Sequence, residues 1–218
     1  MSLIELREAT AGYNGHKILH DVSLSIRQGE RVALVGRSGA GKSTLLRLFY
    51  ERVKGDAALV PQDFGLVKAL SVFHNIYIGR LNKHSVWRNL ANLVKPLQSE
   101  VDGIRPVAAR LGLEEKLFDS VGTLSGGQQQ RTAVGRALYQ QETILLGDEP
   151  VSSVDEHQAR TILESIADSK KTVILAMHDT ALALEYSDRV VALRDGRVVF
   201  DETCDGMTPA DLKPIYGG

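Results

Sequence analysis

The feature that most constrains this chain is a glycine-rich stretch at residues 36–43, Gly-Arg-Ser-Gly-Ala-Gly-Lys-Ser. It fits the pattern G-x-x-x-x-G-K-[ST] of phosphate-binding loops. The apolar run 31–35 before the stretch is typical of a buried strand. Apolar residues at helical spacing follow the stretch, so we predict a helix that begins near Gly41 and Lys42.

The residue types of this loop suit a phosphate group. Gly36, Gly39 and Gly41 have no Cβ, so the backbone can bend tightly and bring its N–H groups close to a phosphate. The start of the helix adds N–H donors and a partial positive charge. Lys42 can reach the β- and γ-phosphates of a nucleotide, and the Ser43 hydroxyl can bind Mg²⁺. An ordinary glycine-rich turn is the alternative, and the flanking strand and helix disfavour it.

Composition and charge narrow the classes of protein that fit. The 218 residues can form one sizeable domain with an inserted subdomain. With 26 Lys and Arg against 27 Asp and Glu, the net charge of −1 offers no field for DNA or an anionic membrane. No apolar run approaches the length of a membrane span, and an acid interrupts the N-terminal segment where a signal peptide would be apolar. A single cysteine, Cys204, excludes an internal disulfide and favours the cytoplasm.

Apolar periodicity predicts the other elements of the chain. Residues 11–15, which include Tyr13, are typical of a turn with an exposed aromatic side chain. A crossover helix between strands 32–35 and 57–60 predicts a parallel sheet. Further strands are expected at 3–6, 22–26, 143–146 and 172–177, a hairpin at 190–193 and 197–200, and helices after Ser125, at 161–166 and at 181–185.

The segment 63–123 has a different texture, because its apolar residues lie mostly at helical spacing. We therefore expect a single domain over residues 1–218. Its core comprises residues 1–62 and 124–218, and a helical insert occupies about 63–123.

Two acids, Asp148 and Glu149, follow the predicted strand 143–146. An acid at the carboxyl end of a strand, beside a phosphate loop, is placed to hold Mg²⁺, and we assign this role to Asp148. Glu149 is then placed to orient or deprotonate an attacking water. A solvated acidic turn is the alternative reading.

The stretch 124–131, Leu-Ser-Gly-Gly-Gln-Gln-Gln-Arg, gives a second strong signal. A helix capped by Ser125 and continued by Gly126 and Gly127 presents bare N–H groups and a hydroxyl, which makes a second anion site. Two such sites on one domain are unexpected unless the second serves a nucleotide held by another subunit. A capped surface helix is the alternative.

Taken together, segments 36–44, 124–128 and 144–150 with His178 resemble the ATPase subunit of an ABC transporter. Their order and spacing match that family over nearly the whole chain, and Leu-Ser-Gly-Gly-Gln is specific to it. The resemblance implies ATP and Mg²⁺ as cofactors. It also implies a head-to-tail dimer, in which each ATP lies between one phosphate loop and residues 125–127 of the other subunit. The implied fold is α/β: a P-loop NTPase core with a parallel sheet, a reduced antiparallel β subdomain and a helical insert.

The resemblance assigns roles to single residues. Tyr13 matches the aromatic that stacks on adenine, and Gln62 matches the glutamine that links Mg²⁺ and the attacking water to the insert. Asp155 matches the aspartate of a loop that crosses the dimer interface. His178 matches the histidine that bonds the γ-phosphate and positions it against Glu149. Read alone, these four would be a surface tyrosine, a polar residue after a proline, a helix cap and a structural histidine.

The complete set of expected site residues has three parts. The catalytic residues are Lys42, Gln62, Glu149 and His178. The metal ligands are Ser43, Gln62 and Asp148. The nucleotide-binding residues are Tyr13, Gly36, Arg37, Ser38, Gly39, Ala40, Gly41, Lys42, Ser43, Thr44, Ser125, Gly126, Gly127, Gln128 and Asp155.

The expected insert is similar to that of phosphonate-import ATPases in segments 64–67, 70–72, 78–81 and 87–88 and at Asn75. This implies an ATP-hydrolysing subunit for the import of phosphonate or a related oxyanion, peripheral on the inner face of the cell membrane. The implied partners are a second ATPase subunit, permease subunits and, indirectly, a substrate-binding protein, with no nucleic acid. Two other readings are a soluble ATPase module of an enzyme complex, such as phosphonate breakdown, and a nucleotide-gated clamp on nucleic acid.

The sequence departs from the family pattern in three places. Val151 replaces the usual threonine after Glu-Pro, and Ser153 and Val154 replace Ala-Leu. Only 18 positions (62 − 44) separate Thr44 from Gln62, where the family normally has several dozen, including strands of a small antiparallel sheet. We therefore expect that sheet to be reduced, and with it part of the wall around the nucleotide.

Overall fold

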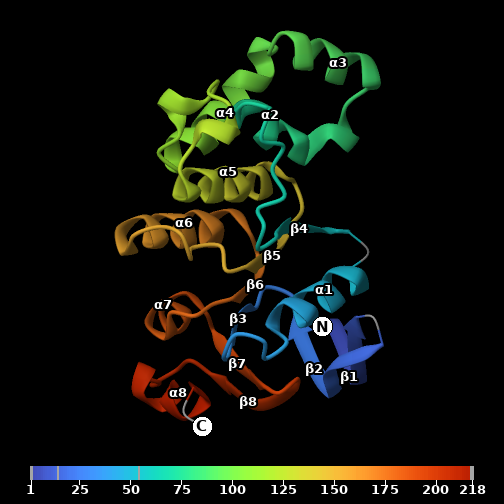
Figure 1. The fold of residues 1–218 in the computed structure, drawn as a ribbon, viewed down its shortest axis with the longest axis vertical. Coiled ribbons are helices and arrows are strands. Elements are labelled where there is room, and N and C mark those ends of the chain that lie inside the picture. Colours follow the sequence, from blue (N-terminus) through green and yellow to red (C-terminus); the bar gives the residue numbers. More distant parts are fainter. Residues whose placement is uncertain (1, 14, 54, 217–218) are drawn as a thin grey trace.

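The computed structural model describes residues 2–13, 15–53 and 55–216. The strands of its central sheet are β3 (Arg31–Val35), β4 (Ala57–Val60), β5 (Ile144–Asp148), β6 (Thr172–Ala176), β7 (Arg189–Arg194) and β8 (Arg197–Thr203). Across the sheet their order is β4-β5-β6-β3-β7-β8 (Figure 1). Neighbours from β4 to β7 are parallel, and β8 is antiparallel to β7. The parallel sheet and the hairpin are both confirmed.

Both faces of this sheet are covered, which explains why its strands are apolar throughout. Side chains of β3 alternate between two buried clusters: Ala33 and Val35 belong to one, and Val32 and Leu34 to the other. The first cluster includes, among others, side chains of the helices α5 (Gly126–Tyr139), α6 (Glu156–Ser169), α7 (Thr180–Tyr186) and α8 (Pro209–Tyr216). The second includes side chains of α1 (Lys42–Arg52) and of the N-terminal strands.

The N-terminal strands β1 (Ser2–Tyr13) and β2 (His16–Arg27) form a separate two-stranded antiparallel sheet. The prediction of a turn at 11–15 was wrong for 11–13, which belong to β1, and Asn14 lies outside the described residues. The physical reason is the tight antiparallel pairing of the two strands: Gly12 lies opposite Lys17, and a Cβ on Gly12 would lie 1.9 Å from the His16 carbonyl oxygen. This glycine therefore serves a strand contact and not a turn.

The phosphate loop leads into α1, which begins at Lys42 as predicted. Its N-cap, Gly41, has a φ of 105°, a conformation that favours glycine. After α1, the described part of the connection to β4 (residues 53, 55 and 56) holds no strand. The small antiparallel sheet is therefore limited to β1 and β2 in the described chain, which confirms its expected reduction.

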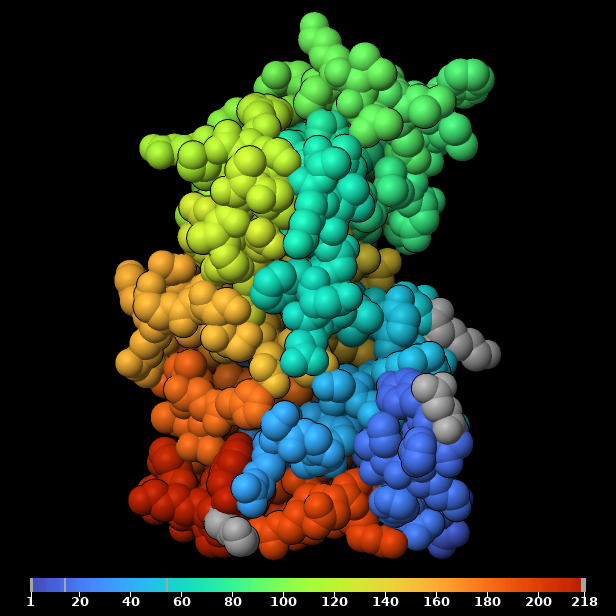
Figure 2. Space-filling model, in the orientation of Figure 1, coloured from blue at the N-terminus to red at the C-terminus, as the bar shows by residue number. Residues whose placement is uncertain are grey.

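Between β4 and α5 the chain forms helices that make up the top layer in Figures 1 and 2. Helix α2 and helix α4 pack against α5. The layer consists of α2 (Val72–Tyr77), η1 (Ile78–Lys83), α3 (Val86–Val94), α4 (Gln98–Arg110), η2 (Glu114–Lys116) and η3 (Val121–Thr123). None of the helices in the described part of the chain is long and apolar enough to span a bilayer.

The last helix, α8, has no counterpart among the predicted elements. Its Leu212 and Ile215 are buried against the sheet. At its start, the Asp211 carboxylate accepts hydrogen bonds from the N–H and the hydroxyl of Thr208. At its end, the Tyr216 hydroxyl accepts a bond of 3.3 Å from the N–H of Gly36, so α8 supports the phosphate loop.

Candidate active site

The phosphate loop folds around its own lysine. Lys42 is 5% exposed, and its Nζ donates to the carbonyl oxygens of Gly36 (2.8 Å) and Arg37 (3.2 Å). Burial lowers the pKa of Lys42, while the nearby Glu149 and Asp148 carboxylates act in the opposite direction. The loop thus holds a buried cation against its own carbonyl oxygens, at the start of a helix, where a phosphate could bind.

The path of the loop depends on its first glycine. Gly36 has a φ of 141°, and a Cβ there would lie 2.3 Å from the Leu193 carbonyl oxygen. On the far side of the loop, the Ala40 carbonyl accepts a hydrogen bond from the N–H of Gly196, in the turn between β7 and β8. Neighbouring strands therefore fix the loop at both ends.

A cavity of about 250 Å³ opens above this loop. It gathers the predicted Gln62, which follows β4, and Glu149, which follows β5, beside the loop residues. The carboxyl ends of parallel strands lie at one edge of a sheet, which is why residues far apart in sequence meet here. The cavity is lined by Ile18, Ser38, Gly39, Gly41, Lys42, Ser43, Thr44, Gln62 and Glu149.

Asp148 ends β5 with a buried carboxyl group that is only partly satisfied. It is 9% exposed, and its Oδ1 has no hydrogen-bond partner in the structure. Burial raises its pKa, Glu149 raises it further, and the neighbouring Ser43 hydroxyl and Lys42 lower it. An unpartnered buried carboxylate oxygen is costly unless a cation approaches it. The residues therefore fit a Mg²⁺ ion held by Asp148, Ser43 and Gln62 together with phosphate oxygens.

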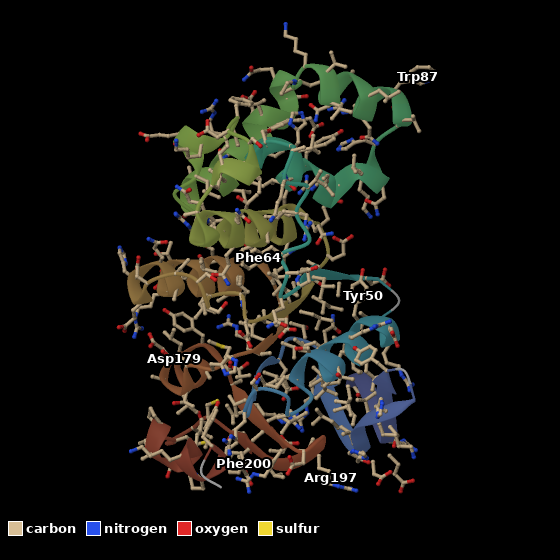
Figure 3. The ribbon with its side chains drawn as sticks, viewed as in Figure 1. Tyr50, Phe64, Trp87, Asp179, Arg197 and Phe200 are labelled. Carbon is tan, nitrogen blue, oxygen red and sulfur yellow. The ribbon has the colours of Figure 1, made fainter. Side chains whose placement is uncertain are left out.

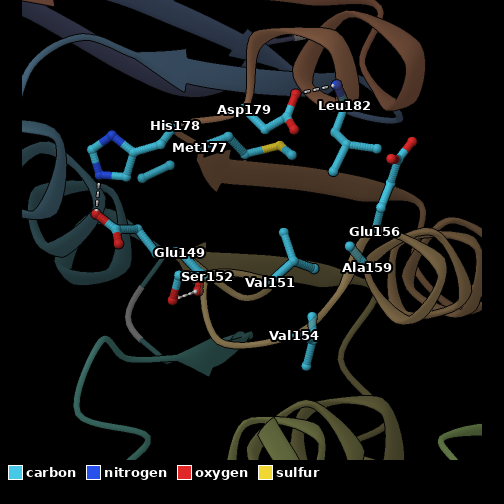
Figure 4. Close-up of a pocket in the computed structure, with 11 residues that line it drawn as sticks. Glu149, Val151, Ser152, Val154, Glu156, Ala159, Met177, His178, Asp179 and Leu182 are labelled. Atoms are coloured by element: carbon cyan, nitrogen blue, oxygen red, sulfur yellow. Dashed lines mark hydrogen bonds and ion pairs between the residues drawn. The ribbon is translucent and has the colours of Figure 1, made fainter.

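Glu149 and His178 face one another across the ends of β5 and β6 (Figure 4). Glu149 Oε1 lies 2.5 Å from His178 Nε2. Glu149 has a φ of 54°, which is uncommon for a residue other than glycine, and its N–H donates to the Ala176 carbonyl at 3.1 Å. The strained backbone places Glu149 where it lines the cavity above Lys42 while its carboxylate contacts His178.

Beyond this pair lies a second, larger cavity of about 380 Å³, shown in Figure 4. The loop after β5 and helices α6 and α7 form its walls. Its other lining residues are Val151, Ser152, Val154, Glu156, Ala159, Ala176, Met177, Asp179 and Leu182. Two of the family departures, Val151 and Val154, thus make one wall apolar and leave the Glu149–His178 contact in place.

Residues 19–152 match the family model described as ABC transporter. The chain belongs to this family. Phosphonates import ATP-binding protein PhnC 2 of Cupriavidus necator is 35% identical to it, over 98% of this chain and 87% of that protein. PhnC of Agrobacterium fabrum is 36% identical, over 97% of this chain and 84% of that protein.

Among solved structures, the dimeric post-hydrolysis ATP-binding cassette MJ0796 bound to ADP and Pi aligns with a TM-score of 0.77 and 25% identity. That alignment covers 93% of this chain and 99% of the cassette. The predicted fold class and the predicted activity are confirmed: the chain is an ABC ATPase, which binds and hydrolyses ATP.

The start of α5, which holds the second predicted anion site, lies apart from the cavity above Lys42. Ser125 Oγ accepts from the Gln128 N–H at 3.3 Å, and Gln128 Oε1 accepts from the Ser125 N–H at 3.0 Å. This capping box corrects the expectation of wholly bare groups, because two of the N–H groups are already bonded. The Ser125 hydroxyl can still donate a hydrogen bond, and the N–H groups of Gly126 and Gly127, in the first turn of the helix, have no acceptor within the helix.

Within the single chain, Asp155 is a helix cap, the role expected of it when it is read alone. It is the N-cap of α6, and its carboxylate accepts from the Gln158 N–H at 2.9 Å. In the described chain, none of the residues 125–128 and 155 lines the cavity above Lys42. One copy of the chain therefore brings together the phosphate loop, Gln62, Asp148, Glu149 and His178, but not the second predicted anion site.

Tyr13 lies at the edge of β1, 40% exposed, where the sequence predicts the adenine. The Arg47 guanidinium carbon lies 5.1 Å from the centre of its ring, a cation–π distance. A small hollow of about 110 Å³ adjoins the pair, and Thr44 and Glu51 also line it. Arg47 did not stand out in the sequence, because only the fold brings α1 beside the end of β1.

A second residue missed by sequence reasoning is Gln130, which is fully buried on α5. Its side-chain amide bonds to the loop that carries Glu149. Three glutamines follow Gly127 in the sequence, but the sequence alone does not show which of them faces the protein interior.

Proposed function

We propose that this ATPase energises the import of phosphonate or a related oxyanion. The observation that carries the proposal is the 35–36% identity, over 97–98% of this chain, to the PhnC proteins of Cupriavidus necator and Agrobacterium fabrum. Their names assign import and not breakdown, so they give no support to a soluble module of a degrading enzyme complex. In this role the chain is cytoplasmic and lies on the inner face of the membrane.

The phosphate loop would act by offsetting charge. On arrival of ATP, Lys42 exchanges the Gly36 and Arg37 carbonyls for β- and γ-phosphate oxygens, which are stronger acceptors. Ser43, Asp148 and Gln62 would hold Mg²⁺, which when bound neutralises charge on the same phosphates. Tyr13 would stack on the adenine at the outer end of the site.

Glu149 and His178 would organise the attacking water. In the structure the imidazole of His178 holds the Glu149 carboxylate at 2.5 Å and so fixes its direction. When the γ-phosphate is present, His178 would donate to it, and Glu149 is then free to accept a hydrogen bond from the water. Positioning and electrostatics of this kind supply most of the catalysis in phosphoryl transfer.

A second copy of the chain would complete each ATP site. Support comes from the separation of the α5 start from the Lys42 cavity and from the dimeric state of the related cassette MJ0796. In the head-to-tail dimer, Ser125, Gly126 and Gly127 of one copy face the ATP held by the phosphate loop of the other. The Ser125 hydroxyl and the N–H groups of Gly126 and Gly127 would then donate to the γ-phosphate.

The helical layer offers a place for a membrane partner. An apolar groove of about 310 Å³ runs between α2–η1 and α3. It is lined by Leu70, His74, Tyr77, Ile78, Leu81, Val86, Asn89, Leu90 and Leu93. We propose that an apolar cytoplasmic segment of a permease subunit occupies this groove.

The orientation of α3 supports this docking proposal. Two of its polar residues bond to neighbouring helices: Arg88 pairs with Glu100 at 2.6 Å, and Asn89 accepts from the Tyr77 hydroxyl at 2.8 Å. Its apolar residues face outward, with Trp87 81% and Val94 88% exposed. Figure 3 shows Trp87 projecting from the end of the layer, away from the core. An exposed apolar stripe of this kind marks an interaction surface.

A reconstitution experiment tests the proposed function. The chain is combined in proteoliposomes with the permease and binding protein encoded beside its gene, and uptake of a radiolabelled alkylphosphonate is measured. We expect uptake that needs ATP and is lost with Glu149→Gln. ATP-dependent uptake of other solutes but not of the phosphonate would refute the substrate class. Co-purification with lyase subunits in place of a permease would refute import.

A further inference from the structure

Gln130 joins α5 to the loop that carries Glu149. Its Nε2 donates to the Glu149 carbonyl oxygen at 2.8 Å and to Ser152 Oγ at 3.2 Å, and its Oε1 accepts from the Ser153 N–H at 2.9 Å. The side chain is 0% exposed, so water cannot replace these bonds without opening the contact between helix and loop. One amide side chain therefore spans the whole turn from Glu149 to Ser153.

This turn needs external support because its first residue is strained. Glu149 occupies the left-handed region, with a φ of 54°, and its carboxylate reaches His178. A non-glycine residue in this region costs free energy and persists only where its surroundings enforce it. The Glu149 carbonyl accepts from both Gln130 and Ser152, so these bonds oppose relaxation of the backbone.

The same side of α5 contacts this loop again one turn earlier. A Cβ on Gly127 would lie 2.9 Å from the Ser153 carbonyl oxygen and 3.2 Å from Val154 Cγ1. Gly127 and Gln130 are three residues apart and so share one face of the helix. The first two turns of α5 are therefore in direct van der Waals and hydrogen-bond contact with the loop that begins at Glu149.

We infer that Gln130 is a positioning residue that sets the direction of the Glu149 carboxylate, and that it makes hydrolysis in one ATP site respond to the other. Its positioning role needs only the ATPase activity. The coupling between sites rests on the proposed dimer, in which the start of α5 touches the ATP of the second copy. A shift of α5 on contact with that ATP reaches Glu149 of its own chain through Gln130.

The first test is Gln130→Met, which keeps the length of the side chain and removes its hydrogen bonds. We expect kcat to fall by about tenfold or more, because small misplacements of a catalytic group are costly, while the Kd for ATP stays within about twofold. The Hill coefficient for ATP should fall towards one. Unchanged kcat in a variant that melts as a folded protein would overturn the inference.

The matched control is Gln129→Met. Gln129 is the neighbouring glutamine on the same helix, but its Nε2 donates to the Leu124 carbonyl within the α5 start at 2.9 Å. This variant loses an amide hydrogen bond without touching the Glu149 turn, so it should keep kcat. An equal loss of kcat in both variants would show a general effect on α5 and overturn the positioning role.

A second variant, Gln130→Glu, separates positioning from simple packing. The carboxylate still accepts from the Ser153 N–H but cannot donate to the Glu149 carbonyl; the protonated acid can. We expect the ratio of variant to wild-type kcat to rise as the pH is lowered, because burial favours the protonated acid. A pH-independent ratio would overturn the inference. If the wild type has a Hill coefficient of one while kcat still depends on Gln130, only the proposed dimer and the coupling between its ATP sites are refuted.

Discussion

At the residue scale, the site is built from groups whose burial is unfavourable without ATP. Asp148 has a buried, unpartnered carboxylate oxygen, and Lys42 is buried beneath carbonyl oxygens that a phosphate would displace. Such groups lower the stability of the free protein and are compensated when the ligand arrives. We therefore expect that replacing these residues raises the stability of the free protein and lowers its ATPase activity.

Asp148→Asn tests this trade-off. The pKa of Asp148 is raised in the folded protein, so its ionised form destabilises the fold once the pH exceeds the pKa of the unfolded chain. The neutral amide should therefore raise the melting temperature of the ligand-free protein, by roughly 2–4 °C for each 1 kcal/mol relieved. Mg²⁺-dependent ATP hydrolysis should fall by about 100-fold, because the proposed metal ligand is lost. A variant that melts lower and hydrolyses normally would contradict this assignment.

Lys170 is a second buried cation, outside the active site, and it gives a prediction for pH. It is 4% exposed, and its Nζ donates to the carbonyls of Gln140 (2.7 Å) and Glu142 (2.8 Å) at the end of α5. Burial lowers the pKa of Lys170 to about 8, although Glu142 opposes this. Because the folded-state pKa lies below the unfolded value of 10.5, the unfolded chain keeps the proton over a range in which the folded protein has released it.

The free energy of unfolding attributable to Lys170 should therefore rise with pH between 8 and 10.5. The measurement is urea unfolding of wild type and Lys170→Met across this range. The difference between the two proteins should grow in favour of wild type, by at most about 1.4 kcal/mol per pH unit. Taking the difference cancels the other groups that titrate in the same range, such as Cys204. A gap that is constant with pH would show that Lys170 titrates normally.

At the element scale, the sequence predicted what is local and missed what depends on contacts. The phosphate loop, the start of α1 and the hairpin turn at Asp195 and Gly196 each follow from a few adjacent residues. The turn predicted at 11–15 was wrong for 11–13 because Gly12 allows close pairing of β1 with β2, and the sequence alone does not distinguish such a glycine from one in a turn. Helix α8 is short and contains Pro214, so its periodicity was too weak to identify it.

The residues of the candidate site divide in the same way: some are recognisable from the adjacent sequence, and others only from their contacts in the fold. Lys42, Gln62 and Glu149 follow strands or sit in a loop with a recognisable pattern, and the parallel sheet brings them together. Gln130 and Arg47 act through partners in other elements, and nothing next to them in the sequence indicates those partners. The capping box that uses part of the α5 start was also missed, although Ser125 and Gln128 have the right spacing for it.

Helix α3 gives a prediction at this scale because its apolar side faces outward. Trp87 is the only tryptophan of the chain and is 81% exposed on α3, so its fluorescence reports on the exposed side of this helix, next to the groove-lining Val86. Addition of the detergent-solubilised permease should shift its emission to shorter wavelength, and Leu90→Asp should abolish both the shift and co-purification. ATP hydrolysis by the isolated chain should remain unchanged, because α3 is remote from the Lys42 cavity.

The control for this experiment is Val199→Asp on β8. Val199 is 48% exposed, like Leu90, but it lies in the core sheet and not in the helical layer. It should retain the fluorescence shift. If Val199→Asp and Leu90→Asp lose docking equally, a general loss of surface hydrophobicity explains the effect and the groove is not the docking site.

At the scale of the whole molecule, the proposed dimer requires two half-sites on each chain, the Lys42 cavity and the α5 start. The Lys42 cavity opens at the carboxyl ends of the strands, and the α5 start lies apart from it, yet Gln130 ties α5 to the Glu149 turn. In a head-to-tail dimer, each phosphate loop would face the α5 start of the other copy, which would give two complete ATP sites. It would also place the helical layers of the two copies where permease subunits could follow their movement.

The most direct test of this account is the mass of the chain in solution with ATP, measured in the Glu149→Gln background, where hydrolysis is blocked. Gly126→Asp is the decisive variant. Apart from the adjacent residues and the backbone of its own helix, no heavy atom lies within 4 Å of a Cβ built at Gly126, and an acid in the first turn suits the helix dipole, so the fold should be unaffected. The new carboxylate would face the γ-phosphate of the second copy. We predict that the mass of the Glu149→Gln protein doubles with ATP, and that the protein carrying both Glu149→Gln and Gly126→Asp stays monomeric. A dimer that still forms with Gly126→Asp would contradict the shared site.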